Sequence, residues 1–285
     1  MLQLENDQLR VELLDPFEDR IHLGERFCWA GYIWQVHDAV AGPLLAGPEW
    51  PRRNPIPFNG QGLPESFRNR SRHGHPYTWR GKQGVAIGAG KLASDAQGEV
   101  FVAEPCRWIF SLEPTHFSAH TRQASAGFDY ELVRSIDLVG RTLVSRSTLT
   151  NHARNRLVLE WFAHPFFALT DGLMSAELPD GSDLVDNPGF LLAGRRLFQK
   201  RRFRDAKDGH MEKLRLAVGR NLRVRFAHPR LTYVELETSF APSECIIWGN
   251  SNTFSLEPYQ SLSLDRNQSK SWSISYVFGP LGPEL

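Results

Sequence analysis

The stretch Thr142-Leu143-Val144-Ser145-Arg146-Ser147-Thr148-Leu149 has a period of two, with Leu143 and Leu149 on one side and Arg146 and Thr148 on the other. Successive side chains of a β-strand point to opposite faces, so this pattern predicts a strand with one buried face. Similar segments of strand length recur along the chain between Gly, Pro, Asn and Asp, whereas sustained helical periodicity is hard to find. The predicted strands are residues 8–14, 31–37, 100–112, 129–138, 143–150, 157–164, 222–226, 231–238 and 272–278.

So many strands do not fit one flat open sheet in a chain of 285 residues. Two antiparallel sheets packed face to face would bury the alternating apolar side chains and protect most strand edges. We therefore predict an all-β chain with a large antiparallel sandwich, and a closed barrel is the alternative that the pattern leaves open. The sequence contains no repeat of fixed period and no long linker, which predicts one domain over residues 1–285.

The composition indicates which classes of binding partner are not expected. Lys and Arg total 33 against 32 for Asp and Glu, so no strong net charge favours nucleic acid or an acidic membrane. Three widely spaced cysteines argue against a disulfide framework and a cysteine-built zinc site. The first residues lack the pattern of a signal peptide, and no apolar run has the length of a membrane span, so we predict a cytoplasmic location. The sequence does not indicate an oligomeric state.

Residues 41–79 interrupt the strand pattern because they are rich in proline and glycine. A long ordered loop is the prediction, and loops of this length are often lids or binding loops. This loop carries arginines and the histidines His73 and His75, so we expect it to form one wall of a pocket. An inert surface excursion made rigid by proline is the competing interpretation.

Three motifs are weak evidence for a binding site. Residues 81–92 are glycine-rich, but Val85 and Leu92 occupy positions where a phosphate loop needs Gly and Ser or Thr, so residues 84–92 are interpreted as a strand. The basic run 195–204 could bind a polyanion, but a strand with a solvated polar face is the favoured interpretation. Neither the pair His116/His120 nor the pair His73/His75 has a local carboxylate at convincing metal-site spacing, so no metal site is predicted.

Two titratable residues remain as candidates for acid–base chemistry. His164 lies in the aromatic run Trp161-Phe162-Ala163-His164-Pro165-Phe166-Phe167, where burial would shift the proton affinity of its ring. Glu257 precedes Pro258 in an otherwise apolar segment, so its carboxylate needs a partner or lines a cavity. A structural histidine and an ordinary salt bridge are the alternatives. Together the two residues form one acid and one base.

Three segments resemble the galactose mutarotase family, the aldose 1-epimerase-like proteins. They are residues 26–36, residues 139–167 with the His-x-aromatic-aromatic sequence at His164, and residues 254–278, which resemble the catalytic Glu segment and closing strand of the family. The resemblance implies a β-supersandwich and an isomerase that needs no cofactor. It also implies His164 as the general acid at the ring oxygen and Glu257 as the general base at the anomeric hydroxyl.

The expected substrate is a small carbohydrate, either a free aldose or a hexose phosphate. The early Arg and Asn-x-x-His-Gly-Gly elements of the family are not cleanly present, and the stretch 67–75 lies in the corresponding place. The predicted substrate-binding residues are Arg68, Arg70, His73, His75, Phe166 and Trp248. A carbohydrate-binding or regulatory module without catalysis is the main alternative, and a polysaccharide-processing enzyme is a weaker one.

Overall fold

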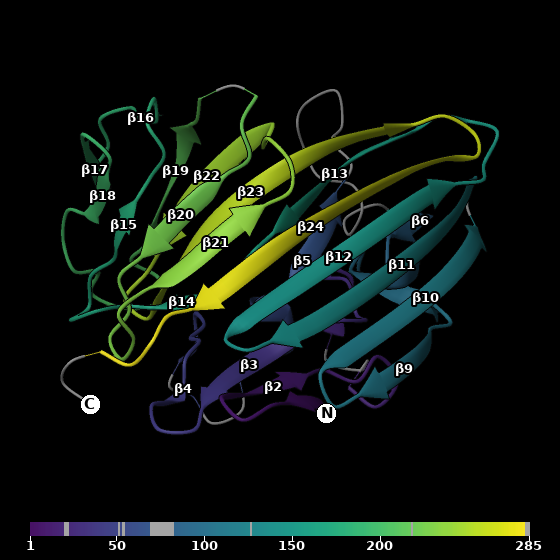
Figure 1. Ribbon diagram of the computed structural model, residues 1–285. Helices are drawn as coiled ribbons and strands as arrows, with labels where there is room; N and C mark the ends of the chain where they lie inside the picture. The colour runs from purple at the N-terminus through teal and green to yellow at the C-terminus, as the bar shows by residue number, and fades with distance from the viewer. Residues whose placement is uncertain are drawn as a thin grey trace.

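Two large antiparallel sheets form the body of the protein in a computed structural model (Figure 1). The structure describes residues 1–19, 23–50, 52, 55–68, 83–125, 127–217 and 219–282. The ten-stranded sheet has the order β17 (Phe190–Ala193), β18 (Arg196–Gln199), β15 (Ser175–Glu177), β20 (Arg223–Phe226), β21 (Val234–Thr238), β24 (Gln268–Phe278), β12 (Thr142–Asn151), β11 (Phe128–Val139), β10 (His116–Ser125) and β9 (Ile109–Glu113). The seven-stranded sheet has the order β16 (Asp183–Leu184), β19 (His210–Arg215), β22 (Glu244–Gly249), β23 (Thr253–Leu264), β13 (Leu157–Ala163) and β5 (Glu65–Arg68), with β14 (Phe167–Ala168) also paired to β23.

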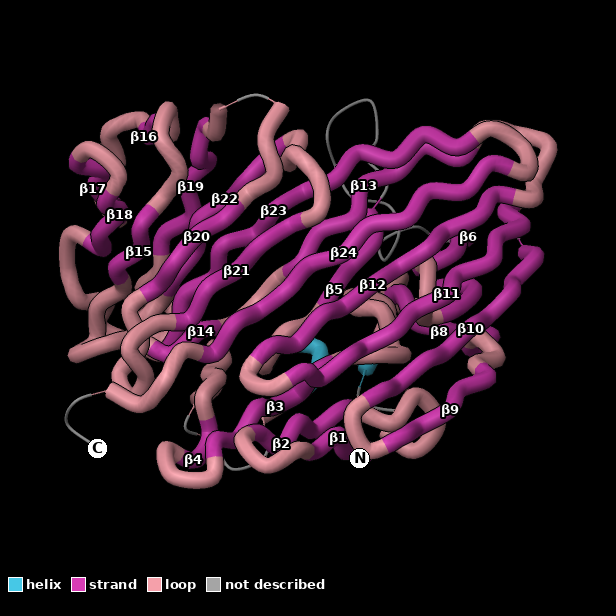
Figure 2. Tube along the Cα trace, viewed as in Figure 1, coloured by secondary structure: helices cyan, strands magenta, loops and turns pink. Residues whose placement is uncertain are grey.

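Two smaller sheets complete the fold, as the tube in Figure 2 shows. One contains β1 (Leu2–Glu5), β2 (Leu9–Leu13), β3 (Ile33–Asp38) and β4 (Gly42–Pro43), and the other contains β6 (Gln83–Ala86), β7 (Gly90–Ser94) and β8 (Val100–Pro105). A single turn of 3-10 helix, η1 (Pro57–Asn59), lies between β4 and β5. The predicted all-β sandwich is confirmed.

Aromatic side chains join the two large sheets. Trp161 on β13 packs against Trp272 on β24 with ring centroids 5.6 Å apart, and Phe167 on β14 packs against Phe226 on β20 at 4.7 Å. All four rings are buried in the main apolar core. Burial of such large side chains between sheet faces is the main source of stability in a sandwich.

Three predictions about elements need correction. Residues 100–112 form two strands, β8 and β9, because the chain turns between them at residues 106–108. Residues 84–92 form a hairpin of β6 and β7, in which Gly88 has a φ of 81° and its amide donates to the Tyr130 hydroxyl. Residues 41–79 are not a loop throughout, since β4, η1 and β5 lie within them.

Strand β23 contributes to two surfaces at once. Every residue from Thr253 to Gln260 is buried, and alternate side chains point to opposite faces. Phe254 and Leu256 point into the main core, whereas Ser255, Glu257 and Tyr259 make hydrogen bonds among polar side chains. We did not predict this strand from the sequence, although polar and apolar residues alternate from Thr253 to Glu257 and from Ser261 to Leu264.

The end of β13 leaves a gap in the pairing with β23. The register runs to Phe162 opposite Tyr259 and resumes on β14 with Phe167 opposite Phe254. Between these points the backbone bonds elsewhere, since the His164 amide donates to the Pro64 carbonyl at 2.9 Å and the Phe166 amide donates to the Gly62 carbonyl at 2.7 Å. Pro165 has no amide hydrogen to contribute to a ladder. The His164 segment therefore stands away from β23 and is fixed by the chain that leads into β5.

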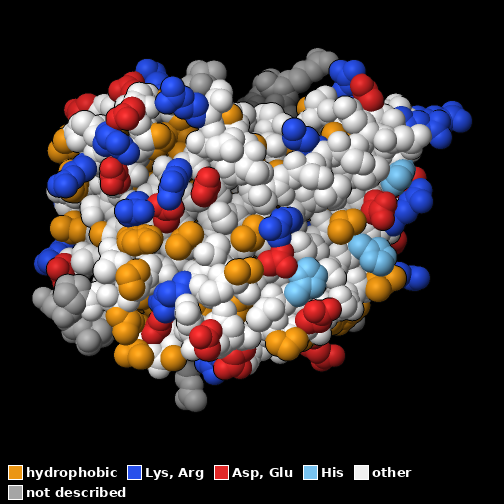
Figure 3. Space-filling model, in the orientation of Figure 1, with side chains coloured by type: hydrophobic (Ala, Val, Ile, Leu, Met, Phe, Trp, Pro, Cys, Tyr) orange, Lys and Arg blue, Asp and Glu red, His pale blue; other side chains and the backbone are white. Residues whose placement is uncertain are grey.

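The surface charges are mixed. Figure 3, which views the ten-stranded sheet, shows basic and acidic side chains interspersed over this face. In the basic run, Arg195 pairs with Glu177 at 3.2 Å, and Arg201 pairs with Asp208 at 2.8 Å. These pairs favour the interpretation of residues 195–204 as a solvated hairpin. No helix in the described ranges is long and apolar enough to cross a membrane.

Candidate active site

His164 and Glu257 meet in the gap beside β13. His164 Nε2 lies 3.4 Å from Glu257 Oε1, and the two residues are only 7% and 5% exposed. Their segments are ninety-three residues apart in sequence, and the departure of β13 from β23 leaves the room for the imidazole opposite the carboxylate. The sequence-predicted pair thus shares one buried location.

Two hydroxyl groups from β23 hold this pair. Ser255 Oγ lies 3.0 Å from His164 Nδ1, and the Tyr259 hydroxyl donates to Glu257 Oε2 at 3.0 Å. Each contact engages the ring nitrogen or carboxylate oxygen that faces away from the other member of the pair. Nε2 and Oε1 are therefore the atoms left to act together on a ligand beside them.

Burial shifts the proton affinities of the two groups in opposite directions. It raises the pKa of Glu257 to about 7, and the hydrogen bond from Tyr259 and the charge of Arg26 oppose this rise. Burial lowers the pKa of His164 well below its usual value, and the charge of Arg26 lowers it further. The imidazole is therefore neutral at neutral pH, and the 3.4 Å contact joins a neutral ring to a carboxyl group that titrates near pH 7.

Aromatic rings form the walls around the imidazole. Phe166 stacks on the His164 ring with centroids 4.4 Å apart, and Trp248 stands edge-on to it at 6.1 Å. Phe27 approaches the ring from a third direction at 6.2 Å. Such faces suit the C–H surfaces of a sugar ring and exclude water from polar groups.

Arg68 reaches the pair through Tyr259. Its Nη1 donates to the Tyr259 hydroxyl at 3.3 Å, and its Nε donates to Glu160 at 3.0 Å. The guanidinium lies 4.0 Å above the centroid of the Tyr259 ring. Arg68 therefore lies within the hydrogen-bond network of Glu257, and the predicted residues Phe166 and Trp248 form aromatic walls beside His164. The other predicted binding residues, Arg70, His73 and His75, lie outside the described residues.

The structure adds site residues that the sequence did not single out, namely Ser255, Tyr259, Phe27 and Arg26. The first two could have been found from Glu257, because residues two positions away on a strand share its face. Phe27 and Arg26 come from the segment before β3, and their contact with the site depends on the packing of distant segments.

The described part of the 41–79 region contacts one of the aromatic rings beside His164. The ring of Phe166 lies so close to Gly60 that a Cβ there would meet it at 2.2 Å, and Gly60 has a φ of 102°. A side chain at this position would therefore clash with the ring and strain the backbone. His116 and His120 lie on strand β10, where His116 pairs with Asp137 at 2.7 Å. Within the described ranges, no group of three or more His, Cys, Asp or Glu converges as a set of metal ligands.

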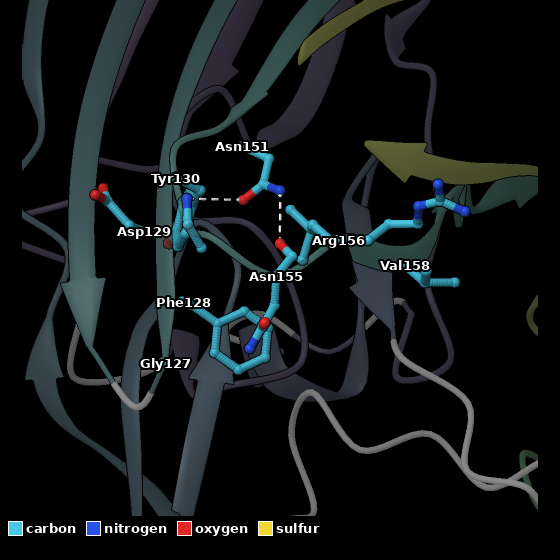
Figure 4. Close-up of a pocket in the computed structure, with 10 residues that line it drawn as sticks. Gly127, Phe128, Asp129, Tyr130, Asn151, Asn155, Arg156 and Val158 are labelled. Atoms are coloured by element: carbon cyan, nitrogen blue, oxygen red, sulfur yellow. Dashed lines mark hydrogen bonds between the residues drawn. The ribbon is translucent and has the colours of Figure 1, made fainter. Parts of the chain in front are cut away.

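A hollow lies beside the start of β11, the end of β12 and the start of β13, and Figure 4 shows its lining. Its volume is about 320 Å³. The charged groups around it are engaged, since Asp129 binds Arg122 and Arg156 binds Asp265. The Asn151 amide donates to the Asn155 and Leu264 carbonyls. This hollow lacks the buried acid–base arrangement of the His164 site.

Comparisons with known proteins show a likeness of structure. The chain is similar to a galactose mutarotase-like protein from Lactobacillus casei ATCC 334, with a TM-score of 0.63, 14% identity, and coverage of 97% of this chain and 99% of that one. It is also similar to the Slr1438 protein from Synechocystis sp. PCC 6803, with a TM-score of 0.60, 15% identity and coverage of 97% and 94%. For the GalM/aldose epimerase homologue from C. elegans the TM-score is 0.55, the identity 12%, and the coverage 99% of both chains.

No model of a protein family matches the sequence, and no curated protein matches it significantly. At identities this low, the structural likeness establishes the fold. The chain has the galactose mutarotase-like β-sandwich fold, as the resemblance of its sequence segments implied.

Proposed function

We propose that this protein is an aldose 1-epimerase-like isomerase that interconverts the α and β anomers of a free sugar or a sugar phosphate. The observation that carries the proposal is the pair of His164 and Glu257, with Nε2 and Oε1 3.4 Å apart in a buried site between aromatic rings. The ring oxygen and the anomeric hydroxyl of an aldose are bonded to the same carbon, so two groups this close can serve both oxygens.

In the proposed reaction the pair carries one proton. His164 gives a proton to the ring oxygen, Glu257 takes the proton of the anomeric hydroxyl, the bond from C1 to the ring oxygen breaks and a C1 carbonyl forms. After rotation about the C1–C2 bond, Glu257 returns a proton to the carbonyl oxygen and His164 accepts the proton of the hydroxyl that closes the ring. The pair ends in its starting state, so no cofactor is consumed.

With a raised pKa on Glu257 and a lowered pKa on His164, the single proton of the resting pair sits on Glu257, so the proposed reaction starts from the less populated form in which His164 is an imidazolium and Glu257 a carboxylate. From that form, the movement of the proton from the imidazolium to the carboxylate is favourable as the ring opens. The aromatic walls keep water away from both groups during the transfer. Arg68, Phe166 and Trp248 are the binding residues that we propose from the described part of the site, and Arg70, His73 and His75 are proposed from the sequence.

Saturation-transfer NMR of anomer exchange tests the proposal, with several aldoses and their 6-phosphates as substrates. We expect acceleration by the wild type and a loss of at least about 100-fold in His164→Ala and Glu257→Gln, the usual contribution of a general acid or base. His120→Gln and Glu237→Gln are matched controls, since both side chains are exposed on the ten-stranded sheet. Sugar binding without any acceleration would instead favour the non-catalytic carbohydrate-binding module.

A further inference from the structure

Arg26 is held beside the acid–base pair by contacts on both its backbone and its side chain. Its Nη1 donates to the Phe58 carbonyl at 3.1 Å and the Asn59 carbonyl at 3.4 Å, so the guanidinium is tied to η1. Its own carbonyl accepts a hydrogen bond from Ser66 Oγ at 2.6 Å, which ties the backbone to β5. The positive charge of Arg26 therefore has a defined place in the fold.

That place is next to the wall of the site. The Arg26 guanidinium carbon lies 4.8 Å from the centroid of Phe27, and the Phe27 ring stands edge-on to His164. The η1 segment that receives the guanidinium continues into Gly60, which packs against Phe166, and Phe166 stacks on the imidazole. The Arg26 side chain thus contacts one wall of the site, Phe27, and the segment that leads to another.

We propose that Arg26 is a positioning residue whose fixed positive charge sets the pH range in which the His164–Glu257 pair holds its proton. A cation at this location favours the carboxylate form of Glu257 and disfavours the imidazolium form of His164. The pKa directions agree, because the charge of Arg26 lowers the pKa of both groups. This inference deepens the proposed function and rests on it for its catalytic consequence.

Other charged and titratable groups near the pair also affect the pKa values of His164 and Glu257. On β22 the charge of Glu244 raises the pKa of Glu257, and the buried Cys245 thiol has its own pKa raised, in part by Glu257. On β23 the Tyr259 hydroxyl lowers the pKa of Glu257. From β5, Arg68 acts through Tyr259 and is itself paired with Glu160 on β13. Among these groups, Arg26 is the one whose charge lowers the pKa of His164 as well as that of Glu257.

Two variants separate the charge of Arg26 from its forked geometry. Arg26→Lys keeps the charge and loses the fork, whereas Arg26→Gln loses the charge. NMR titration of the His164 ring and of the Glu257 carboxyl, without any sugar, measures the two proton affinities. The His164 and Glu257 signals are assigned by their loss in His164→Asn and Glu257→Gln. Arg156→Gln is the matched control, because Arg156 is an exposed arginine paired with Asp265.

We expect both midpoints to rise by about 0.5 to 1 pH unit in Arg26→Gln, since the charge is half-buried and partly screened. Arg26→Lys and Arg156→Gln should titrate like the wild type. Equal shifts in Arg26→Lys and Arg26→Gln would mean that the effect comes from the tie to η1 rather than from charge, and unchanged midpoints in Arg26→Gln would mean that there is no effect. Either result overturns the proposal.

The activity measurement then separates this inference from the proposed function. If the wild type exchanges anomers, the pH optimum of Arg26→Gln should move to higher pH by the same amount as the two midpoints. If the midpoints shift but no sugar is isomerised, the electrostatic role of Arg26 stands and the proposed isomerase activity fails. If anomers are exchanged and the optimum and midpoints of Arg26→Gln stay in place, the activity stands and the role of Arg26 fails.

Discussion

Glu65 and Arg134 form a buried ion pair that joins the two large sheets, with 2.6 Å between Glu65 Oε2 and Arg134 Nη1 and exposures of 4% and 1%. Glu65 is on the edge strand β5 and Arg134 is in the middle of β11. Ser145 and the indole of Trp161 donate to the same carboxylate. The pair therefore fixes the strand that ends in Arg68 and that receives the His164 backbone next to Pro64.

Removing the charge of one partner of this pair should destabilise the protein. Glu65→Gln leaves the Arg134 charge without its counter-ion in the core, and we expect the free energy of unfolding to fall by about 3 to 5 kcal/mol. Urea denaturation followed by tryptophan fluorescence measures the change. Asp265→Asn removes the partner of the exposed Arg156 and should cost less than about 1 kcal/mol. Equal losses in the two variants would show that the buried pair has no special structural role.

Glu257 should destabilise the folded protein at neutral and alkaline pH. Its pKa rises from an ordinary 4.5 to about 7 on folding, so the native state keeps a proton that the unfolded chain releases between these values. The stability that this proton contributes is complete below pH 4.5 and is lost as the pH rises through 7. We therefore expect Glu257→Gln to be inactive but more stable than the wild type at pH 8 by about 3 kcal/mol. This difference should vanish near pH 4.5, and a difference independent of pH would contradict the raised pKa.

The Tyr259 hydroxyl should control the alkaline limit of activity. Its hydrogen bond favours the carboxylate of Glu257, so Tyr259→Phe should raise the pKa of Glu257 above about 7. Because the pair needs one proton, activity should decline above that pKa, and the alkaline limb of the pH profile should move upward in the variant. The profile of kcat/KM against pH measures this shift. A limb that moves to lower pH would mean that the proton lost there does not come from Glu257.

Ser255 should select the tautomer of the His164 ring. We expect its hydroxyl to donate to Nδ1, which leaves the ring proton on Nε2, where it faces Glu257 and a bound sugar. The 15N chemical shifts of the ring report the tautomer directly. In Ser255→Ala we expect a mixture of tautomers and about a 5- to 10-fold loss of kcat, equivalent to one ordinary hydrogen bond. Ser261→Ala is a suitable control, because Ser261 is exposed on the same strand.

The sequence was informative where one face of a strand is buried and the other is solvated. Strands β11 and β12 alternate in this way, and their predicted ranges agree with the structure to within two residues. The prediction missed β23, in which polar residues of the site alternate with apolar residues of the core and every residue from Thr253 to Gln260 is buried. His164 and Glu257 were identified because a buried titratable residue in an apolar stretch is chemically conspicuous. Arg26 was not identified from the sequence, because its place beside the site depends on the contacts between the segment before β3 and η1.

Because one face of β23 packs in the core and the other carries the polar site residues, both the core and the site depend on the register of this strand. A slip of one residue would turn Ser255, Glu257 and Tyr259 toward the interior and expel Phe254 and Leu256 from it. Folding to the wrong register would thus remove the core packing and the proton-transfer groups in a single event. A chain that folds with the correct register of β23 therefore also has Ser255, Glu257 and Tyr259 in place in the site. Substitutions that change which ligand the site accepts can then occur in the walls contributed by Phe27, Phe166 and Trp248 without disturbing this register.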